Sequence, residues 1–312
     1  MLGWMVCGSR IGPPDQCALR VGGMTALKNI LLLGRNGQVG WELTRTLAPL
    51  GNVVALSSNE LNLADPDATS KKIRELGPDI IVNAAAYTAV DKAESEPGLA
   101  MKINGTAPGI LAEEAKRLNA LLVHYSTDYV FDGKKPGGYK EEDQTNPLSV
   151  YGKTKLAGEE ATRNSDANHL IFRTSWVYGM RGHNFLLTML RLAREREELR
   201  IVDDQIGAPT WSRMIAEATS LAIGSYREDL SGTYHMSAGG STSWRGFAGA
   251  IFELSNLEKK PKLIPIPTED YPLPAKRPQN SILSNIKLNS CFGLQLPEWK
   301  ASLSLCLDIA GS

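Results

Sequence analysis

A tyrosine stands four positions before a lysine in the segment SVYGKTKLAGEE, residues 149–160. Residues four apart share one face of a helix, so Tyr151 and Lys155 could act on the same bound molecule. A phenol keeps its proton at neutral pH because its pKa is about 10, and a nearby ammonium stabilises the phenolate that remains after the proton is donated. The pair therefore indicates general acid catalysis, while the same spacing also fits a surface helix on which Tyr151 packs and Lys155 faces water.

Short apolar runs alternate with helical patterns in the first half of the chain. The runs that predict buried strands are NILLL (29–33), VVALS (53–57), DIIVNAA (79–85), ALLVHYST (120–127) and HLIFRTS (169–175). Helical patterns occupy 38–50, 65–76, 97–118 and 151–163. Continuous Ile, Leu and Val runs separated by helices are typical of a parallel sheet covered on both sides. We therefore predict an α/β fold class with a Rossmann-type doubly wound parallel sheet.

The regular alternation ends after Trp176. An amphipathic helix is predicted over 184–199, a helix near 212–224 and a strand near 233–236, followed by a proline-rich tail. We expect a dinucleotide-binding domain over 24–175, to which about 205–236 returns, and a smaller, irregular C-terminal substrate-binding domain within 176–312. The cleft between them should lie at the carboxyl ends of the strands. Residues 1–23 show no clear pattern, and we expect a disordered or non-native extension there.

A glycine-rich turn, GRNGQVG, follows the first predicted strand and opens the first helix. Without Cβ atoms, Gly34, Gly37 and Gly40 let the backbone turn tightly and approach a pyrophosphate, which a helix N-terminus attracts. A tight turn with no ligand is the alternative, but the order of strand, glycines and helix favours a bound dinucleotide. The residues predicted to contact the cofactor here are Gly34, Arg35, Gly37, Gln38, Val39 and Gly40.

The end of the second strand, which selects between NADH and NADPH, reads VVALSSNEL. An acidic residue there binds the adenosine ribose hydroxyls and favours NAD, but Ser57 stands in that position. Arg35 could bind a 2′-phosphate, whereas Glu60 nearby would oppose one. We predict NADPH or NADH as the cofactor, with NADPH preferred, and we include Ser57, Asn62 and Leu63 in the binding site.

The third predicted strand ends in NAAAYT, whose small alanines would let a dinucleotide lie across the strand ends. Ordinary packing between a strand and a helix explains the same alanines. We predict cofactor contacts at Ala86, Tyr87 and Thr88. Asn104 in the following helix matches an asparagine behind the cofactor in the extended short-chain dehydrogenase/reductase superfamily, which these segments resemble. The resemblance implies a further contact there, although the amide could instead satisfy a backbone kink.

The fourth predicted strand ends in HYSTDYVFDG, at the edge where a nicotinamide should lie. Hydride delivery to a ketone makes an alkoxide that must receive a proton. Tyr151 could supply that proton, Lys155 could bond to the nicotinamide ribose, and Thr127 could orient the substrate oxygen. We expect the ammonium to lower the pKa of Tyr151 by ~3 units, which requires ~4 kcal/mol of differential interaction. We predict Tyr151, Lys155 and Thr127 as the catalytic residues.

Bulk composition argues against several other classes of protein. Lys and Arg together number 34, as do Asp and Glu, so no net charge attracts nucleic acid or an acidic membrane surface. The start of the chain lacks the apolar run of a secretory signal or a membrane span. The four cysteines form no close pair and the four histidines lack ligand spacing, which argues against disulfides and a histidine metal site. We expect no nucleic-acid or membrane partner and a reducing, cytoplasmic location.

Longer segments resemble the dTDP-4-dehydrorhamnose reductase family of the extended short-chain dehydrogenase/reductase superfamily. Between about Lys28 and Trp299, the segments that carry the resemblance are GRNGQVGWEL, NAAAYTAVDKAESEP, HYSTDYVFDG, VYGKTKLAGE, IFRTSWVYG, NFLLTMLRLAREREEL, DDQIGAPT and PAKRPQNS. The resemblance implies that NAD(P)H reduces the C4 ketone of dTDP-4-dehydro-β-L-rhamnose to dTDP-β-L-rhamnose. That is the last step of dTDP-rhamnose biosynthesis, which serves lipopolysaccharide O-antigen synthesis.

The resemblance also implies contacts with the dTDP-sugar substrate. Thr127 and Asp128 would bind the sugar, and Trp176 would pack on the apolar side of the deoxysugar. Arg277 would meet the diphosphate. A tryptophan wedge between domains is the alternative for Trp176, and a surface salt bridge is the alternative for Arg277.

Members of the family include Mg²⁺-assisted homodimers with acidic residues at the subunit contact. The resemblance therefore implies a homodimer here, with Mg²⁺ at Glu197 and Glu198, joined by Glu195. A charged helix face explains the same carboxylates.

Two other functions fit part of the pattern. A sugar-nucleotide 4,6-dehydratase or epimerase has a similar fold, but dehydratases carry an Asp-Glu pair after the threonine, whereas Asp128 and Tyr129 follow Thr127 here. An epimerase would keep and recycle its cofactor. A non-catalytic regulator similar to the β subunit of methionine adenosyltransferase is the second alternative, and the complete set of Thr127, Tyr151 and Lys155 argues against it.

Overall fold

The computed structural model describes residues 27–311, and the extension expected at 1–23 lies outside this range. At the centre is a six-stranded sheet of order β10-β5-β4-β3-β1-β2, in which every neighbouring pair is parallel. The strands are β1 (Lys28–Leu33), β2 (Gly51–Leu56), β3 (Ile80–Asn83), β4 (Leu121–Thr127), β5 (His169–Thr174) and β10 (Gly232–His235). The predicted α/β class with a parallel, doubly wound sheet is confirmed.

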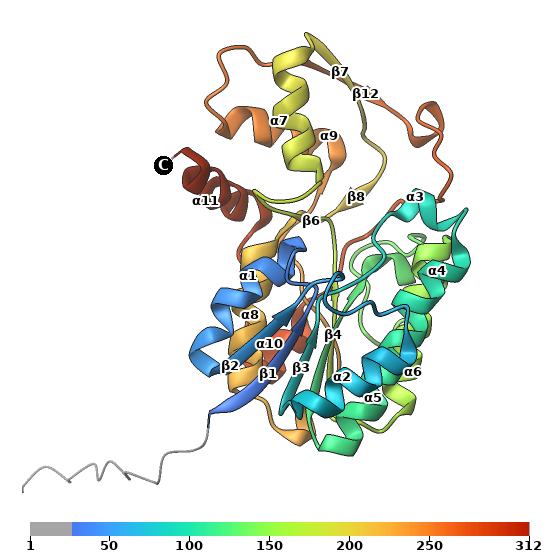
Figure 1. Ribbon diagram of the computed structural model, residues 1–312. Helices are drawn as coiled ribbons and strands as arrows, with labels where there is room; N and C mark the ends of the chain where they lie inside the picture. Colours follow the sequence, from blue (N-terminus) through green and yellow to red (C-terminus); the bar gives the residue numbers. More distant parts are fainter. Residues whose placement is uncertain (1–26, 312) are drawn as a thin grey trace, which may run out of the picture.

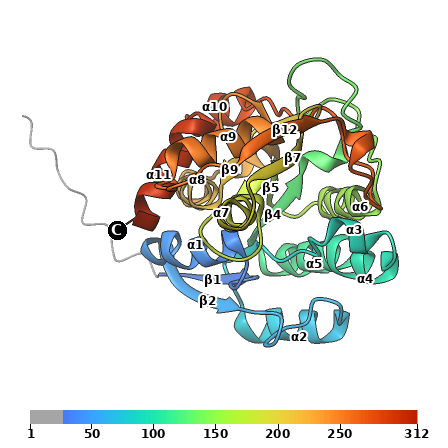
Figure 2. The ribbon, with the colours of Figure 1, turned by 90° about the horizontal axis from the view of Figure 1, so that it is seen from above.

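Both faces of the sheet are buried. Successive side chains of a strand point to opposite sides, so a strand can contribute to two hydrophobic cores. In β1, Ile30 and Leu32 pack into one hydrophobic core, and Leu31 and Leu33 pack into another. These alternating burials explain why the strands read as unbroken apolar runs. One face is covered by α1 (Gln38–Thr46), α8 (Ser212–Gly224) and α10 (Ile286–Phe292), and the other by α2 (Pro66–Leu76), α5 (Ala107–Leu118) and α6 (Val150–Asn164) (Figures 1 and 2).

The helix expected over 97–118 is interrupted. It consists of α4 (Pro97–Met101), a π-helical turn η2 (Lys102–Thr106) and α5. Pro108 lacks the N–H that would bond to the carbonyl of Asn104. A Cβ on Gly158 of α6 would come within 2.1 Å of that same carbonyl oxygen. The interruption therefore accompanies a close crossing of the two helices, which only a glycine permits.

A smaller part of the protein lies beyond the carboxyl ends of the strands (Figure 1). Its hydrophobic core is built by α7 (Phe185–Glu195), α9 (Trp244–Leu254), α11 (Trp299–Gly311), β7 (Glu198–Val202) and β12 (Lys262–Ile266). Two-residue strands join its other segments in two pairs, β6 (Val177–Tyr178) with β9 (Thr210–Trp211) and β8 (Ile206–Gly207) with β11 (Thr242–Ser243). Single turns complete the chain at η1 (Ala48–Leu50), α3 (Val90–Ala93), η3 (Asp128–Val130), η4 (Glu228–Leu230) and η5 (Thr268–Asp270).

The helix expected over 184–199 is too long. The helix α7 ends at Glu195, because Arg196 adopts an extended conformation with φ −132° and ψ 144°. The strand β7 follows, with Leu199 and Ile201 buried between exposed neighbours, and it pairs in parallel with β12. Alternate burial is the period of a strand, and the charged residues before it continue the helical pattern in the sequence.

Segments distant in sequence return to the large part of the protein. The helix α8 packs on α1, and β10 extends the sheet beside β5.

Cys291 and Cys306 are free thiols. Within residues 27–311, every helix is too short or too polar to cross a lipid bilayer.

A buried ion pair fastens α6 to the sheet. Glu159 of α6 is fully buried, and its carboxylate accepts hydrogen bonds from Arg173 of β5 at 2.9 and 2.7 Å and from Arg163 at 2.9 Å. Burial would raise the pKa of Glu159, but the hydrogen bonds and charge of Arg173 outweigh this effect and hold the pKa below its ordinary value. The pair therefore remains charged and fixes the helix that carries Tyr151 and Lys155.

We predict that Glu159→Leu lowers the free energy of unfolding by about 3–5 kcal/mol, because it leaves the Arg173 guanidinium buried without its partner. Urea unfolding measures this loss. Arg163→Leu is the matched control: its side chain is 36% exposed, and its removal should cost less than about 1 kcal/mol. Equal losses in the two variants would contradict the assignment of Arg173 as the partner that holds the helix.

Candidate active site

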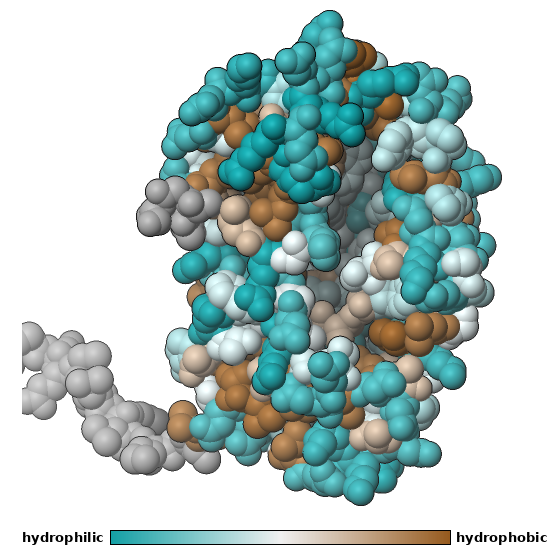
Figure 3. All heavy atoms as spheres, turned by 45° about the horizontal axis from the view of Figure 1, so that its top comes forward, coloured by the Kyte–Doolittle hydropathy of each residue, from teal (hydrophilic) through white to brown (hydrophobic). Residues whose placement is uncertain are grey.

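A cleft of about 690 Å³ lies at the carboxyl ends of β1, β3 and β4, where the molecule is hollowed between its two parts (Figure 3). Of the residues predicted from the sequence, those that line it are Gly34, Gly37, Gln38, Val39, Ser57, Asn62, Leu63, Ala86, Thr88, Thr127, Asp128, Tyr151, Lys155 and Trp176. Five other residues predicted to bind cofactor or substrate lie outside this lining, namely Arg35, Gly40, Tyr87, Asn104 and Arg277.

The glycine-rich turn lies directly on β3. Gly34 has φ +86°, and a Cβ on it would lie 2.7 Å from the backbone nitrogen of Ala85. A Cβ on Gly40 would lie 2.0 Å from the carbonyl oxygen of Gly34, so this glycine shapes the turn from inside α1. Gly37 is the N-cap of α1, and no described side chain caps its first turn. The free N–H groups and the positive end of the helix dipole suit a diphosphate.

Gln38 connects the two parts of the protein across the cleft. Its Oε1 accepts a hydrogen bond from Asn184 Nδ2 at 2.8 Å. Asn184 is the N-cap of α7, and its Oδ1 accepts a hydrogen bond from the backbone N–H of Leu187 at 3.0 Å. The side chain of Gln38 therefore positions the small part of the protein relative to the glycine-rich turn.

Arg35 is directed away from the cleft. Its guanidinium donates to the carbonyl oxygen of Ala55 at 3.1 Å and pairs with Glu60 at 3.2 Å. Glu60 also accepts hydrogen bonds from the backbone N–H and the hydroxyl of Ser57 at 2.9 and 2.7 Å. These hydrogen bonds hold the pKa of Glu60 below its ordinary value. The Glu60 carboxylate thus pairs with Arg35, the residue that is predicted to bind a 2′-phosphate.

The segment after β3 contributes Ala86 and Thr88 to the cleft, whereas Tyr87 between them turns away and donates its hydroxyl proton to Glu96 at 2.7 Å. Asn104 is fully buried. Its side chain accepts from the backbone N–H of Tyr87 at 2.8 Å and donates to the carbonyl of Tyr87 at 3.0 Å. Asn104 therefore holds the cleft wall from behind.

Tyr151 and Lys155 lie one turn apart on α6, and both line the cleft. The helix begins after Ser149, whose hydroxyl accepts from the backbone N–H of Gly152 at 3.2 Å. A Cβ on Gly152 would lie 2.3 Å from the carbonyl oxygen of Tyr129. The cap and this close approach seat the first turn of α6 against the end of β4.

The pKa of Tyr151 differs from the predicted one. Burial raises the pKa of Tyr151 to about 12, and a hydrogen bond with Thr127 offsets only part of that rise. The Lys155 ammonium is directed elsewhere: it donates to the carbonyl of Tyr125 at 2.5 Å and lies 3.3 Å from Nε2 of His124. The expectation of a lowered pKa is therefore wrong in this structure, because desolvation of the phenol and the nearby carboxylate of Asp128 both raise the pKa.

Lys155 is 2% exposed, so its ammonium is removed from bulk water. Burial lowers the pKa of Lys155 to about 8, and the carboxylate of Glu159 one turn along α6 opposes the fall. His124 lies beside it, with Nδ1 3.1 Å from the amide nitrogen of Asn83. Burial and the charge of Lys155 hold the pKa of His124 well below its ordinary value, so this imidazole is neutral.

Neither His124 nor Asn83 is among the residues predicted from the sequence. A histidine inside an otherwise apolar strand, directly before the segment YSTD, is the signal that could have identified the first. Asn83 stands at the end of β3, the strand next to β4. Only the register of the sheet brings its side chain to that of His124.

Thr127 and Asp128 stand at the end of β4. The hydroxyl of Thr127 donates to Oδ1 of Asp128 at 3.0 Å. Burial raises the pKa of Asp128 to about 6, although hydrogen bonds from Ser281 and Thr127 lower it in part. The carboxyl group can therefore be neutral or charged near pH 6, in contact with whatever occupies the cleft.

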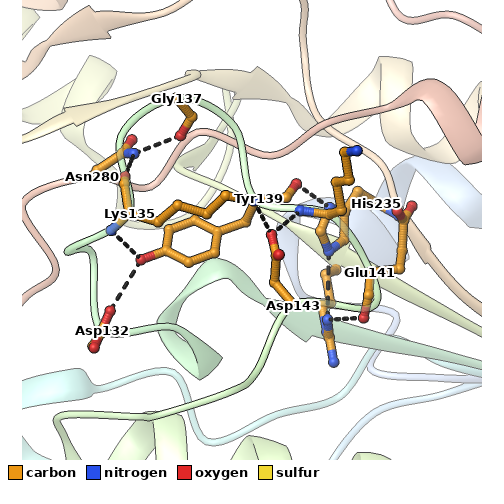
Figure 4. A network of polar contacts seen from close by, with 10 residues as sticks. Asp132, Lys135, Gly137, Tyr139, Glu141, Asp143, His235 and Asn280 are labelled. Atoms are coloured by element: carbon orange, nitrogen blue, oxygen red, sulfur yellow. Dashed lines mark hydrogen bonds and ion pairs between the residues drawn. The ribbon is translucent and has the colours of Figure 1, made fainter.

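A polar network holds the chain that follows η3 (Figure 4). Asn280 donates from Nδ2 to the carbonyls of Lys135 and Gly137 at 2.6 and 2.7 Å. The ring of His235 contacts the carbonyl of Tyr139 through Nδ1 at 3.1 Å. The network thus joins the loop around 135–139 to Asn280, next to Ser281 in the chain.

The substrate residues predicted beyond β5 differ in placement. Arg277 lies in a salt bridge with Asp91 of α3, at 3.1 and 2.8 Å, with its side chain 18% exposed, and its contact with the diphosphate stays a prediction. Trp176 lines the cleft and stacks on Trp244. Trp244 also lines the cleft but is absent from the predicted set, because no motif surrounds it in the sequence.

The carboxylates predicted to hold Mg²⁺ are dispersed. Glu195 ends α7 and pairs with Arg191 at 2.9 Å, whereas Glu198 begins β7 and pairs with Lys262 at 3.4 Å. Glu197 lies between the helix and the strand, so the three do not share one helix face. In the part of the chain that the structure describes, no three His, Cys, Asp or Glu side chains gather to hold a metal ion. Mg²⁺ at Glu197 and Glu198 stays a prediction.

Known proteins resemble the chain over nearly its whole length. The model of the RmlD substrate binding domain family matches residues 28–311. A dTDP-4-dehydrorhamnose reductase of Burkholderia thailandensis is 49% identical over 292 residues, which cover 89% of this chain and 97% of the relative. Among solved structures, a dTDP-4-dehydrorhamnose reductase of Clostridium acetobutylicum superposes with a TM-score of 0.86 at 39% identity, over 91% of this chain and 100% of the other. That of Bacillus anthracis, in complex with NADP, has a TM-score of 0.85 at 37% identity, over 90% of this chain and 99% of the other.

We predict that Asp128→Asn stabilises the protein at pH 7.5. The folded-state pKa of about 6 exceeds the ordinary value of 3.8, so the folded protein binds the proton more tightly and its stability falls as pH rises between these values. Above pH 6 the full cost is ~3 kcal/mol. Urea unfolding from pH 4 to 8 should show the variant more stable at pH 7.5 and equal to the wild type near pH 4.

Asp132→Asn is the matched control for this measurement. Hydrogen bonding from the backbone of Lys134 holds the pKa of Asp132 below its ordinary value, so this variant should lose stability at pH 7.5. If Asp128→Asn were also less stable than the wild type at pH 7.5, Asp128 would not bear a desolvation cost.

Proposed function

The chain belongs to the RmlD substrate binding domain family, and on that premise we propose that it is a dTDP-4-dehydrorhamnose reductase. It reduces the C4 ketone of dTDP-4-dehydro-β-L-rhamnose to dTDP-β-L-rhamnose with NAD(P)H, the last step of dTDP-rhamnose biosynthesis. The observation that carries the proposal is that Tyr151, Lys155 and Thr127 line one cleft together with the glycine-rich turn.

The residues of this cleft divide the chemistry among them. When bound, the reduced nicotinamide supplies the hydride. Thr127 hydrogen-bonds to the ketone oxygen and orients it. Tyr151 gives its phenolic proton to the same oxygen, so that the ketone gains one hydride and one proton and becomes an alcohol. The phenolate recovers a proton from solvent before the next turnover.

The buried state of the acid and its neighbour suits this role. With a pKa of about 12, Tyr151 carries its proton throughout the neutral range. Donation leaves a phenolate in a partly buried site, where a charge interacts more strongly than in water. The Lys155 ammonium is the cation that lines the same cleft on the same helix, and it stabilises that phenolate.

The cofactor lies along the large part of the protein in this proposal. The diphosphate binds at Gly34, Gly37, Val39 and the first turn of α1, since the backbone there has room and uncapped N–H groups. Ser57, Asn62 and Leu63 would hold the adenosine. Ala86 and Thr88 would hold the nicotinamide, and Lys155 would hydrogen-bond to its ribose.

We propose that NADPH is preferred over NADH. Arg35 lies beside the end of β2, where it pairs with Glu60, and its guanidinium can turn to a 2′-phosphate. The relative from Bacillus anthracis that binds NADP supports the proposal. A homodimer, a Mg²⁺ ion and a cytoplasmic location stay predictions.

The rival functions have less support. A 4,6-dehydratase would need a second carboxylate where Tyr129 stands. The ring of Tyr129 instead packs edge-on against Tyr151, with centroids 5.6 Å apart. A regulatory subunit would have no use for a phenol and a buried ammonium that line one cleft. Net loss of NADPH absorbance with the sugar substrate separates a reductase from an epimerase, which recycles its cofactor.

We predict that the wild-type protein consumes NADPH when given dTDP-4-dehydrorhamnose made in situ from dTDP-glucose. Tyr151→Phe should lower kcat about 10²–10⁴-fold, because the general acid is lost, while Tyr271→Phe, which alters a tyrosine that is 55% exposed, should leave kcat unchanged. Undiminished turnover by Tyr151→Phe would show that another group donates the proton.

The pH profile of the same reaction tests Lys155. Since its pKa is about 8, kcat/KM should fall as pH rises through that value and the ammonium is lost. Lys155→Met should turn over slowly and without this alkaline limb, whereas Lys153→Met, two residues away and exposed, should keep it. A limb near pH 8 that persists in Lys155→Met must belong to another group.

We predict that Glu60→Gln improves use of NADPH. The amide keeps a hydrogen bond to Ser57 but removes the charge that competes with a 2′-phosphate for Arg35. The ratio of kcat/KM for NADPH to that for NADH should rise about two- to fivefold, the scale of exposed ion pairs, and should fall in Arg35→Ala. An equal change for both cofactors would show that Glu60 does not act at the 2′ position.

A further inference from the structure

Trp176 has a backbone conformation that needs support from its surroundings. Its φ is +47°, in the left-handed region that bulky side chains seldom adopt and that costs of order 1–3 kcal/mol. The residue follows β5 at the point where the chain leaves the sheet for the small part of the protein. Its carbonyl accepts a hydrogen bond from the backbone N–H of Thr210 at 3.2 Å.

The small part of the protein provides a slot for the Trp176 indole. The ring of Trp244 stacks on it with centroids 3.6 Å apart and planes inclined by 4°. A Cβ on Gly207 would lie 2.5 Å from Cε2 and 2.7 Å from Nε1 of the same indole. The antiparallel pairing of β8 with β11 sets Gly207 opposite Thr242, two residues before Trp244, so one short ribbon builds both sides of the slot.

Trp244 is itself fixed in place. Its Nε1–H donates to Oε1 of Gln205 at 3.1 Å, and Gln205 donates in turn to the hydroxyl of Thr268 at 3.0 Å. The ring of Phe185 packs against it with centroids 4.7 Å apart. Both indoles are partly exposed and line the cleft. The two stacked rings therefore form one plate in the wall of the cleft.

We propose that Trp244 is a positioning residue for the sugar substrate: it holds Trp176 in the Gly207 slot, so that the two indoles present a fixed apolar wall to the deoxysugar. This inference rests on the proposed function and adds a residue to it. A stacked aromatic pair is worth more than the area that it buries, and this gain offsets the backbone cost at Trp176. Without Trp244, the Trp176 indole loses its partner and can leave the slot.

A purely structural role for Trp244 makes a different prediction. Its ring also contacts the core of the small part of the protein through Phe185. If that were its whole role, its loss would lower stability and affect use of both substrates alike. A selective effect on the sugar nucleotide distinguishes the positioning role.

The stack can be observed without turnover. Two parallel indoles at 3.6 Å couple their electronic transitions, and this coupling lowers their combined ultraviolet absorbance below that of two separate indoles. This feature should be present in the wild type, absent in Trp244→Phe and in Trp176→Phe, and retained in Trp299→Phe, which removes an indole outside the cleft. Retention of the feature in Trp244→Phe would overturn the inference.

Steady-state kinetics then test the role. Trp244→Ala should raise KM for dTDP-4-dehydrorhamnose about tenfold and leave KM for NADPH within about twofold, with partial rescue in Trp244→Phe. Gly207→Ala should reproduce the increase while both indoles remain, because its Cβ displaces the Trp176 ring. If Trp244→Ala does not fold, Trp244→Phe and Gly207→Ala decide the question.

The outcomes separate this inference from the proposed function. If the wild type consumes no NADPH with the sugar substrate, the proposed function and the inference fail together. If the wild type turns over but Gly207→Ala and the Trp244 variants keep the wild-type KM for the sugar, or raise KM for both substrates equally, the inference alone fails.

Discussion

The candidate site depends on a lysine ammonium that has been removed from water. Burying a charge is costly unless polar partners and an opposite charge compensate. For Lys155 the compensation comes from the carbonyl of Tyr125 and from Glu159 one turn further along α6. Glu159 in turn needs Arg173 on β5. The charge of Lys155 is therefore stabilised by Glu159 of α6, which is in turn held by Arg173 of β5.

This chain of contacts links fold to function through α6. The same helix carries Tyr151, is capped by Ser149 and crosses the interrupted helix at Gly158. The position of α6 is thus determined by the Ser149 cap near the cleft, by the crossing at Gly158 and by the ion pair of Glu159 with Arg173. The small part of the protein contributes little to this acid–base pair but completes the opposite wall, where Trp176 and Trp244 stack.

Local patterns in the sequence predict the cleft better than contacts between distant segments, for a physical reason. The glycine-rich turn, the apolar strands and the Tyr151–Lys155 spacing are local patterns, each set by a few consecutive residues. The position of Trp244, the salt bridge that occupies Arg277 and the contact of His124 with Lys155 arise between segments distant in sequence. The pKa of Tyr151 was predicted in the wrong direction because it depends on burial, which spacing alone does not reveal. The sequence does not predict the strand β7, because the charged residues before it continue the helical pattern of α7.

The central claim is that Lys155 is a desolvated ammonium whose proton is held less tightly than that of an ordinary lysine. Nuclear magnetic resonance of side-chain-labelled lysines, with Lys155→Met to assign the signal, measures its titration directly. The account predicts one lysine that titrates near pH 8, about two units below the others, and that is absent from the variant. If the Lys155 signal titrates with the exposed lysines near pH 10.4, the ammonium is not desolvated and the account is wrong.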